Sequence, residues 1–261
     1  MPRSRVIPCL LVRGGGLVKT RRFGEDKYIG DPINAVRIFN EKEADELIVL
    51  DIDATVQGRE PDYAMIENLA AECRMPLCYG GGISTVDQAK RIMALGVEKI
   101  ALSAAAIARP PLIAEIAAQV GNQSVAVVLD ARKKMLGGYR AFVRNGRVDT
   151  KISPLDFACE AERLGAGEVV INAIDHDGMM NGYDLALADS LRAAVRLPLT
   201  LLGGAGSLAH MQEAVHRLGT VGLAAGSLFV FKGQYRAVLI NYPSHAERAT
   251  LQPVKDGPCP V

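Results

Sequence analysis

The sequence predicts an α/β protein made of a single (β/α)8 barrel, a TIM barrel, built as a twofold repeat of two half-barrels. Eight short apolar runs alternate with helical segments along about 240 residues, which is the order and size typical of this fold. The second half also repeats the first, because segment 77–84, an apolar run followed by three glycines, returns 123 positions later as 199–207. A doubly wound open sheet is the competing fold, but two halves of four units close naturally into a ring.

The predicted strands are short apolar runs bounded by glycine, proline or charged residues, as buried parallel strands require. They are Val6–Val12, Leu47–Ile52, Leu77–Tyr79, Lys99–Leu102, Val125–Leu129, Glu168–Ile171, Leu199–Leu202 and Val221–Ala225. Segment 14–30, rich in glycine and charge, is expected to be a long loop. Asn145-Gly146 within segment 139–149 predicts a type I′ hairpin in the loop after the fifth strand.

The predicted helices follow the strands and begin at recognisable caps. Asp31 and Ser153 each stand before a proline, which combines an N-cap with a residue suited to the first helical position. Ser84 and Asp87 suggest a capping box. The predicted helices cover 32–44, 61–73, 84–95, a segment from about 110, a segment from 154, 185–195, 207–218 and 229–240. The barrel is expected to be one domain over 1–261, with a core at about 5–240 and a loosely ordered tail at 243–261.

The composition excludes several classes of function. A net charge of +1 gives no basic face for nucleic acid and no polybasic membrane anchor. No apolar run reaches the roughly 20 residues of a membrane span. The five cysteines lack any CxxC spacing and are Cys9, Cys73, Cys78, Cys159 and Cys259. We therefore expect a cytoplasmic protein with reduced thiols, without a nucleic-acid or membrane partner, a cofactor or a metal.

The two glycine loops predict phosphate binding. The active site of a TIM barrel lies at the C-terminal ends of the strands, where each loop combines with the small residues that end the next strand. Backbone N–H groups at such strand-to-helix junctions suit a phosphate, so two clusters half a barrel apart suit a ligand with a phosphate at each end. The alternative is that the glycines only make tight turns. The residues predicted for phosphate binding are Gly82, Ser103, Ala104, Asp177, Gly178, Gly204, Gly226 and Ser227.

One carboxylate is a candidate for catalysis. Asp130 ends an otherwise apolar strand and is expected to project into the barrel mouth, where partial burial raises the pKa of a carboxyl group and suits it to general acid or base catalysis. The alternative is an aspartate that accepts hydrogen bonds from loop N–H groups. We expect that structural role for Asp51.

A combination of motifs along the chain is specific for one family. The motifs are Val6–Leu10, Asp31-Pro32, Asp45-Glu46-Leu47, Gly80–Ile83, Ala166-Gly167-Glu168, Ile174–Gly178, Gly182-Tyr183-Asp184 and Gly203–Gly206. Together they resemble HisF, the cyclase subunit of imidazole glycerol phosphate synthase, over residues 3 to about 240. The sister isomerase HisA shares the barrel and the repeat but matches these motifs less well. The resemblance implies that a separate glutaminase docks at the bottom of the barrel and that its ammonia crosses the interior to a substrate held at the top by two phosphates.

The resemblance also implies a pair of catalytic aspartates, one on strand one and one on strand five. Asp130 matches the second, but Leu11 stands at the position of the first. Leucine exchanges no proton, so a two-carboxylate mechanism loses one member. Leu202 and the pair Ser103-Ala104 also depart from the polar residues of the family at the mouth, whereas Lys19, expected in a mobile first loop, matches.

The bottom of the barrel keeps the family pattern. Arg5, Glu46, Lys99 and Glu168 stand at the starts of strands and match the charged ring that gates ammonia entry in the family. Ordinary ion pairing at exposed strand ends is the alternative.

Retained ammonia handling combined with altered cyclisation chemistry resembles the HisF-like paralogues of acetamidino modification of bacterial surface sugars. There a HisH-like glutaminase and the barrel are thought to supply a separate amidotransferase that acts on a nucleotide-linked sugar. We expect this chain to be such a subunit, with a phosphorylated small molecule bound at the mouth. Two alternatives stay open: a cyclase of histidine biosynthesis in which Asp130 alone suffices, and a non-catalytic barrel that binds and activates a glutaminase.

Overall fold

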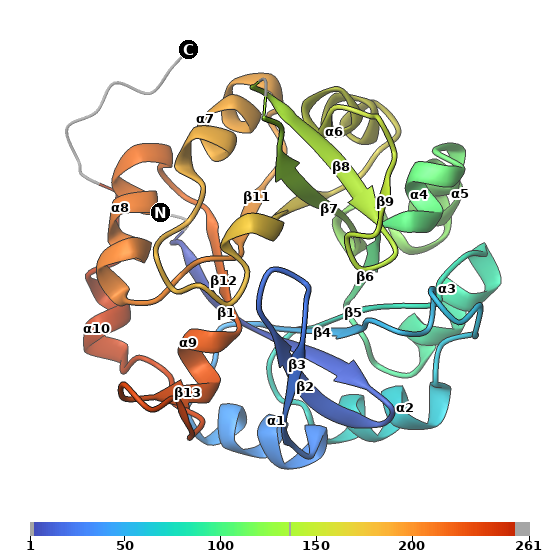
Figure 1. The fold of residues 1–261 in the computed structure, drawn as a ribbon. Coiled ribbons are helices and arrows are strands. Elements are labelled where there is room, and N and C mark those ends of the chain that lie inside the picture. The colour runs from blue at the N-terminus through green and yellow to red at the C-terminus, as the bar shows by residue number, and fades with distance from the viewer. Residues whose placement is uncertain (1–2, 136, 254–261) are drawn as a thin grey trace.

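Eight parallel strands close into a barrel in the computed structural model, which describes residues 3–135 and 137–253 (Figure 1). The barrel strands, in order around the ring, are β1 (Arg5–Arg13), β4 (Leu47–Asp51), β5 (Leu77–Gly80), β6 (Lys99–Leu102), β7 (Val125–Lys133), β10 (Glu168–Ala173), β11 (Leu199–Leu202) and β12 (Gly222–Ala225). The ring closes because β12 pairs with β1 in parallel, with Arg5 opposite Gly222. The predicted TIM barrel is confirmed.

Helices surround the barrel and largely begin where their caps predicted. They are α1 (Pro32–Glu41), α2 (Tyr63–Glu72), α3 (Val86–Ala94), α4 (Ala104–Ala108), α5 (Pro111–Val120), α6 (Pro154–Arg163), α7 (Leu185–Ala194), α8 (Leu208–Leu218), α9 (Ser227–Val230) and α10 (His245–Ala249). Asp31 and Ser153 are N-caps that accept from Asn34 N and Asp156 N. The capping box of α3 is built by Thr85 and Gln88 rather than by Ser84 and Asp87, so that expectation was one residue out of register.

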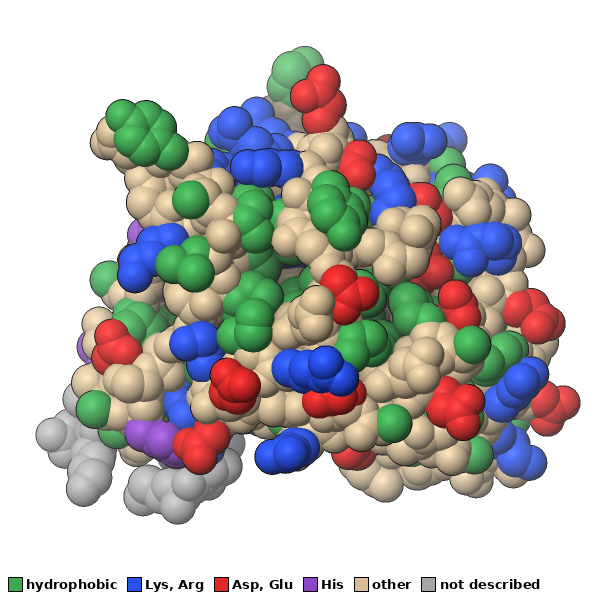
Figure 2. All heavy atoms as spheres, turned by 90° about the horizontal axis from the view of Figure 1, so that it is seen from below, with side chains coloured by type: hydrophobic (Ala, Val, Ile, Leu, Met, Phe, Trp, Pro, Cys, Tyr) green, Lys and Arg blue, Asp and Glu red, His purple; other side chains and the backbone are tan. Residues whose placement is uncertain are grey.

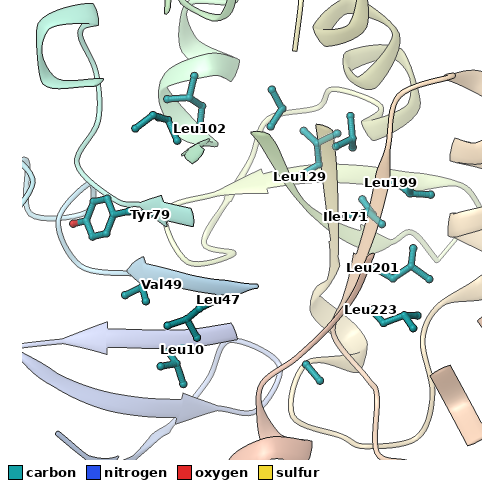
Figure 3. Packing of buried hydrophobic residues seen from close by; sticks show 14 of the residues in the cluster. Leu10, Leu47, Val49, Tyr79, Leu102, Leu129, Ile171, Leu199, Leu201 and Leu223 are labelled. Atoms are coloured by element: carbon teal, nitrogen blue, oxygen red, sulfur yellow. The ribbon is translucent and has the colours of Figure 1, made fainter. Parts of the chain in front are cut away.

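The strands bury both faces. Figure 3 shows residues such as Leu10, Val49 and Tyr79 in the layer between the strands and the surrounding helices, and this layer forms the large core. Residues that alternate with them point into the barrel and form a second, smaller apolar cluster, which includes Ile7 and Ile48. The period-two alternation of a strand thus separates the two cores.

Two antiparallel hairpins extend the barrel and carry the twofold repeat. β1 continues into β2 (Gly16–Thr20) and β3 (Asp26–Gly30), and β7 continues into β8 (Tyr139–Val143) and β9 (Val148–Asp149). The expected loop over 14–30 is therefore wrong, since most of that segment pairs as strands. Asn145 and Gly146 have φ of 57° and 70°, and Arg147 N donates to Arg144 O, as a type I′ turn requires.

The C-terminal segment differs from the prediction. Instead of a helix over 229–240, the helix α9 ends at Val230, and β13 (Phe231–Lys232) pairs with β14 (Ala237–Val238) across a turn in which Gly233 has φ of +73°. The apolar residues there stand in two consecutive runs rather than at helical spacing, which favours strands.

The tail is also more ordered than expected. Ser244 and Glu247 form the capping box of α10, and buried Arg248 donates to Glu43 O and pairs with Asp45 Oδ1 at 2.7 Å. Leu251 is buried as well. The expectation of a loosely ordered tail is therefore wrong for residues 243–253, and its remainder, 254–261, lies outside the described residues.

Candidate functional site

An open pocket occupies the C-terminal mouth of the barrel and collects the residues predicted there. The space inside it, its open mouth included, is about 1260 Å³. Its lining contains Leu11, Lys19, Gly82, Ser103, Ala104, Asp130, Asp177, Gly178, Gly204, Gly226 and Ser227. The predicted phosphate residues fall into two groups, one after β5 and β6 and one after β10, β11 and β12. These strands stand on opposite sides of the ring.

The two glycine loops have a structural requirement of their own. Gly82 and Gly204 have φ of +74° and +110°, and a Cβ would lie 2.8 Å from Arg59 O at the first position and 2.0 Å from Gly182 O at the second. Only glycine fits where backbones approach so closely. Loop packing thus explains these glycines with or without an anion, and phosphate binding stays a prediction.

Asp177 has a structural role that the sequence did not indicate. Its carboxylate accepts from Thr20 Oγ1 at 2.6 Å and Phe23 N at 3.2 Å, while its own N–H donates to Ala173 O at 3.0 Å. These bonds hold the β2–β3 hairpin over the mouth. Any contact with an anion at this position therefore falls to the neighbouring Gly178.

Lys19 lies on β2 and is buried, contrary to the expectation of a mobile loop. Its Nζ donates to Cys9 O at 2.8 Å, and a Cβ at Gly226 would come within 1.9 Å of that ammonium group. The hairpin thus places a fixed positive charge beside the second group of predicted phosphate residues.

Asp130 lines the pocket with a raised pKa. Burial, with a smaller contribution from Asp177, raises the pKa of its carboxyl group to about 7, although a 2.9 Å hydrogen bond from Asn172 Nδ2 acts to lower it. This carboxyl group can hold or release a proton near neutral pH. Leu11 lies on β1, opposite β7 in the ring, and lines the same pocket without an exchangeable proton.

Sequence reasoning did not single out Asn172. It is buried on β10, and its Oδ1 has no hydrogen-bond partner within the described parts of the chain, although it lines the pocket. A buried amide oxygen without a partner is costly, so a donor on a ligand would stabilise it. Its place beside Asp130 depends on the pairing of β7 with β10.

We expect Asp130→Asn to stabilise the protein at alkaline pH. Because the folded-state pKa is raised, the wild type loses stability as pH rises from about 4 to about 7, whereas the amide does not ionise. The difference in the free energy of unfolding should reach about 1–3 kcal/mol in favour of the variant above pH 7. Urea unfolding between pH 5 and 8 measures it, with exposed Glu67→Gln as control. A pH-independent difference would contradict the assignment.

The opposite end of the barrel is crossed by a closed ring of ion pairs. Arg5 pairs with Glu46 and, at 2.9 Å, with Glu168, while Lys99 pairs with Glu46 at 2.8 Å and with Glu168 at 2.7 Å. Both carboxylates are buried. Burial alone would raise the pKa of Glu168, but Arg5 and Lys99 hold it below its usual value. The ring therefore differs from ordinary ion pairing at exposed strand ends, which was the alternative interpretation of these four residues.

Thr200 is a further member of this ring that sequence reasoning missed. Its side chain is fully buried and its Oγ1 donates to Glu168. Threonine is common in β-strands because it is β-branched, so its presence in this strand gave no sign of a role in the ring. Only the pairing of β10 with β11 places it beside the carboxylate.

Between the ring and the pocket lies an interior of small and apolar side chains. It consists of Ile7, Cys9, Ile48, Cys78, Ala101, Ala126, Val128, Val170, Leu202 and Ala224, with Leu11 and Leu50 packed against them. Burial raises the pKa of the Cys9 thiol to about 11 and raises that of Cys78 well above its usual value, so both thiols are neutral. The interior therefore carries no charge between its two polar ends.

The structure confirms one predicted structural residue and adds two general findings. Asp51 Oδ1 accepts from Asp53 N and Ala54 N, each at 3.0 Å. Within the described ranges, no helix is both long and apolar enough to cross a membrane. Among the same residues, His, Cys, Asp and Glu form no group of three or more that could hold a metal ion.

Comparison of the sequence with known proteins identifies a matching family and several relatives. A sequence model described as "Histidine biosynthesis protein" matches residues 5–236. The chain is 55% identical over 249 residues to a Vibrio vulnificus protein provisionally named imidazole glycerol phosphate synthase subunit hisF3, covering 95% of this chain and 96% of the relative. It is 51% identical over 243 residues to the Pseudomonas aeruginosa protein provisionally named subunit hisF2, covering 93% and 97%. It is 38% identical over 229 residues to imidazole glycerol phosphate synthase subunit HisF of Streptococcus mutans, covering 88% and 91%.

Proposed function

This chain belongs to the histidine biosynthesis family, among HisF-type subunits of imidazole glycerol phosphate synthase. From that membership we propose that it is a barrel subunit to which a separate glutaminase supplies ammonia. The HisH-like glutaminase docks at the N-terminal face. The ammonia leaves at the C-terminal mouth and serves a separate amidotransferase in the acetamidino modification of a nucleotide-linked surface sugar.

The charged ring carries this proposal. Four ion pairs close the N-terminal end of the barrel, and the two carboxylates that form them, Glu46 and Glu168, are buried. A buried ion-pair network contributes little net stability compared with apolar packing. Its presence across the axis is better explained by passage of a small polar molecule.

The uncharged interior of the barrel suits the passage of ammonia from the ring to the mouth. Ammonia crosses apolar surroundings as neutral NH3, whereas an ammonium ion would have to be desolvated at high cost. Ala101, Ala126 and Ala224 keep the interior side chains small, and the neutral Cys9 and Cys78 offer no charge that would trap a proton.

The mouth supports a departure from cyclisation. Leu11 stands where the family has its first catalytic aspartate, and Leu202 adds a second apolar side chain to the same pocket. Asp130 keeps a polar or proton-transfer role, with the glycine loops as a site for a phosphorylated ligand. The numbered names of the relatives hisF2 and hisF3 fit a protein that exists beside another HisF.

An isotope competition tests the proposal. The barrel, its HisH-like glutaminase and the sugar amidotransferase are combined with glutamine labelled with ¹⁵N in the side-chain amide and with an excess of unlabelled ammonium. A channelled route predicts amidine nitrogen enriched in ¹⁵N well above the bulk ammonium pool. Enrichment equal to the pool would overturn the route. If glutaminase turnover rises on mixing but no nitrogen reaches the acceptor, the barrel is instead a non-catalytic activator.

A further inference from the structure

A second pocket lies beside the mouth, between the β2–β3 and β13–β14 hairpins. It adjoins the main pocket, because Lys19 and Thr20 line both. Five positively charged side chains surround it: Lys19, Arg21, Arg22, Lys27 and Arg236. Figure 2, which views the barrel from the side, shows a group of Lys and Arg side chains near the top of the molecule, with further ones spread over the rest of this face. We call this hollow the cationic pocket.

Positive charges outnumber negative ones in the cationic pocket, where five cations stand beside two acidic residues, Glu25 and Asp26. Of its two acidic residues, Asp26 already pairs with Arg13 at 2.6 Å. None of the five cations forms an ion pair with a carboxylate in the described parts of the chain. They bind neutral acceptors instead. Arg22 Nε, for example, donates to Asp175 O at 3.2 Å.

Arg236 links the cationic pocket to the predicted phosphate residues. Its guanidinium donates to Gly178 O at 3.2 Å and to Ser227 Oγ at 3.4 Å. Burial lowers the pKa of this guanidinium and the nearby Arg21 lowers it further. The carboxylate of Asp177 acts on this pKa in the opposite sense, but less strongly than Arg21 does. Arg21 and Arg236 therefore still repel each other, and an anion placed between them would be favoured.

The cations are also held in place. Phe231, at the start of β13, has Lys27 Nζ 5.3 Å from its ring centroid and the Arg236 guanidinium 4.7 Å from it. Cation–π contacts of this kind fix the direction of a charged side chain. Lys27 and Arg236 are thus oriented before any ligand arrives, which lowers the entropic cost of binding.

We propose that the cationic pocket binds the second phosphate of a diphosphate group whose first phosphate lies at Gly178 and Ser227. With Glu25 counted, the five cations leave a net of four positive charges, of which one phosphate dianion compensates two. A diphosphate places further negative charge on both sides of Arg236. The two phosphates of this group are adjacent and lie on one side of the barrel mouth, so the residues predicted for phosphate binding after β5 and β6 are not part of this site. This inference goes beyond the proposed function, since anion binding does not depend on the ammonia route.

Calorimetric titration of the barrel alone tests this site, with inorganic pyrophosphate and inorganic phosphate as probes at low ionic strength. Pyrophosphate is expected to bind at least about tenfold more tightly than phosphate. Arg236→Ala should weaken pyrophosphate about 10- to 100-fold, because a hydrogen bond to a charged group is lost. Arg236→Lys should recover part of the affinity.

Lys232→Ala is the matched control. Lys232 lies on the same hairpin and is exposed, but it does not line the pocket, so its removal changes net charge equally and should alter affinity less than about twofold. Equal losses in the two alanine variants, or equal affinity for phosphate and pyrophosphate, would overturn the proposal. Adenosine and uridine diphosphates identify the source: tighter binding than pyrophosphate indicates a nucleotide, and equal binding indicates that only the diphosphate is recognised. Because no glutaminase is present, a failure here leaves the ammonia route untouched.

Discussion

The purified protein, supplied with the ribonucleotide substrate of imidazole glycerol phosphate synthase and ammonium salts, is expected to cyclise it at least about 10²-fold more slowly than a family member with both aspartates. Positioned acid–base catalysis by one side chain contributes about 10²–10⁴-fold in rate, and Leu11 cannot supply it. Asp130, with its pKa at about 7, is left as the one carboxyl group of the pair. Product formation under saturating ammonium measures the rate without any glutaminase.

Two variants make this expectation sharper. Leu11→Asp should raise the cyclisation rate by about tenfold or more, since it returns a carboxylate to the strand opposite Asp130. Leu50→Asp is the matched control, because Leu50 is the register partner of Leu11 on β4 and lines the same pocket, yet stands on the wrong strand. Robust cyclisation by the unaltered protein would instead identify a working cyclase of histidine biosynthesis and would refute the sugar-modification proposal.

Lys99→Met is expected to destabilise the protein by about 3–5 kcal/mol, because it leaves two buried carboxylates with Arg5 as their remaining cationic partner. For a chain of this size that loss corresponds to a fall in Tm of roughly 10 °C. Thermal or urea unfolding measures it. The effect should shrink in acid: the lowered pKa of Glu168 gives stability that is present above the unfolded value of about 4.5 and is lost as pH falls through the folded value.

The same variant should alter ammonia transfer. In the isotope competition described above, the ¹⁵N enrichment from labelled glutamine should fall severalfold, while use of free ammonium stays close to that of the wild type. Lys90→Met, which removes an exposed lysine from α3, serves as control for both readouts. Unchanged enrichment in a folded Lys99 variant would remove the gate from the proposal while leaving its structural role.

The barrel could be predicted because its signals are local. Apolar runs at strand length, the caps at Asp31 and Ser153 and the repeated glycine loops each act within a few residues, and together they fix the order of elements. The errors lie where a local pattern is ambiguous. Segment 14–30 forms strands because β1, outside the segment, pairs with β2 and stabilises a strand that the local sequence specifies weakly. In segment 229–240 the two short strands pair with each other across the turn at Gly233.

The candidate site also has features that could be predicted from the sequence and features that could not. The sequence by itself determined which residues stand at the strand ends, hence Asp130, Leu11 and the four charged residues, whose roles the family resemblance implies. Only the tertiary structure decided that those four residues form one closed network joined by Thr200, that Asn172 donates to Asp130, and that Arg21 and Arg236 line the same pocket. The reason is physical: strand register brings together side chains from opposite halves of the chain, and charge and desolvation act between neighbours in space, which the order of residues alone does not specify.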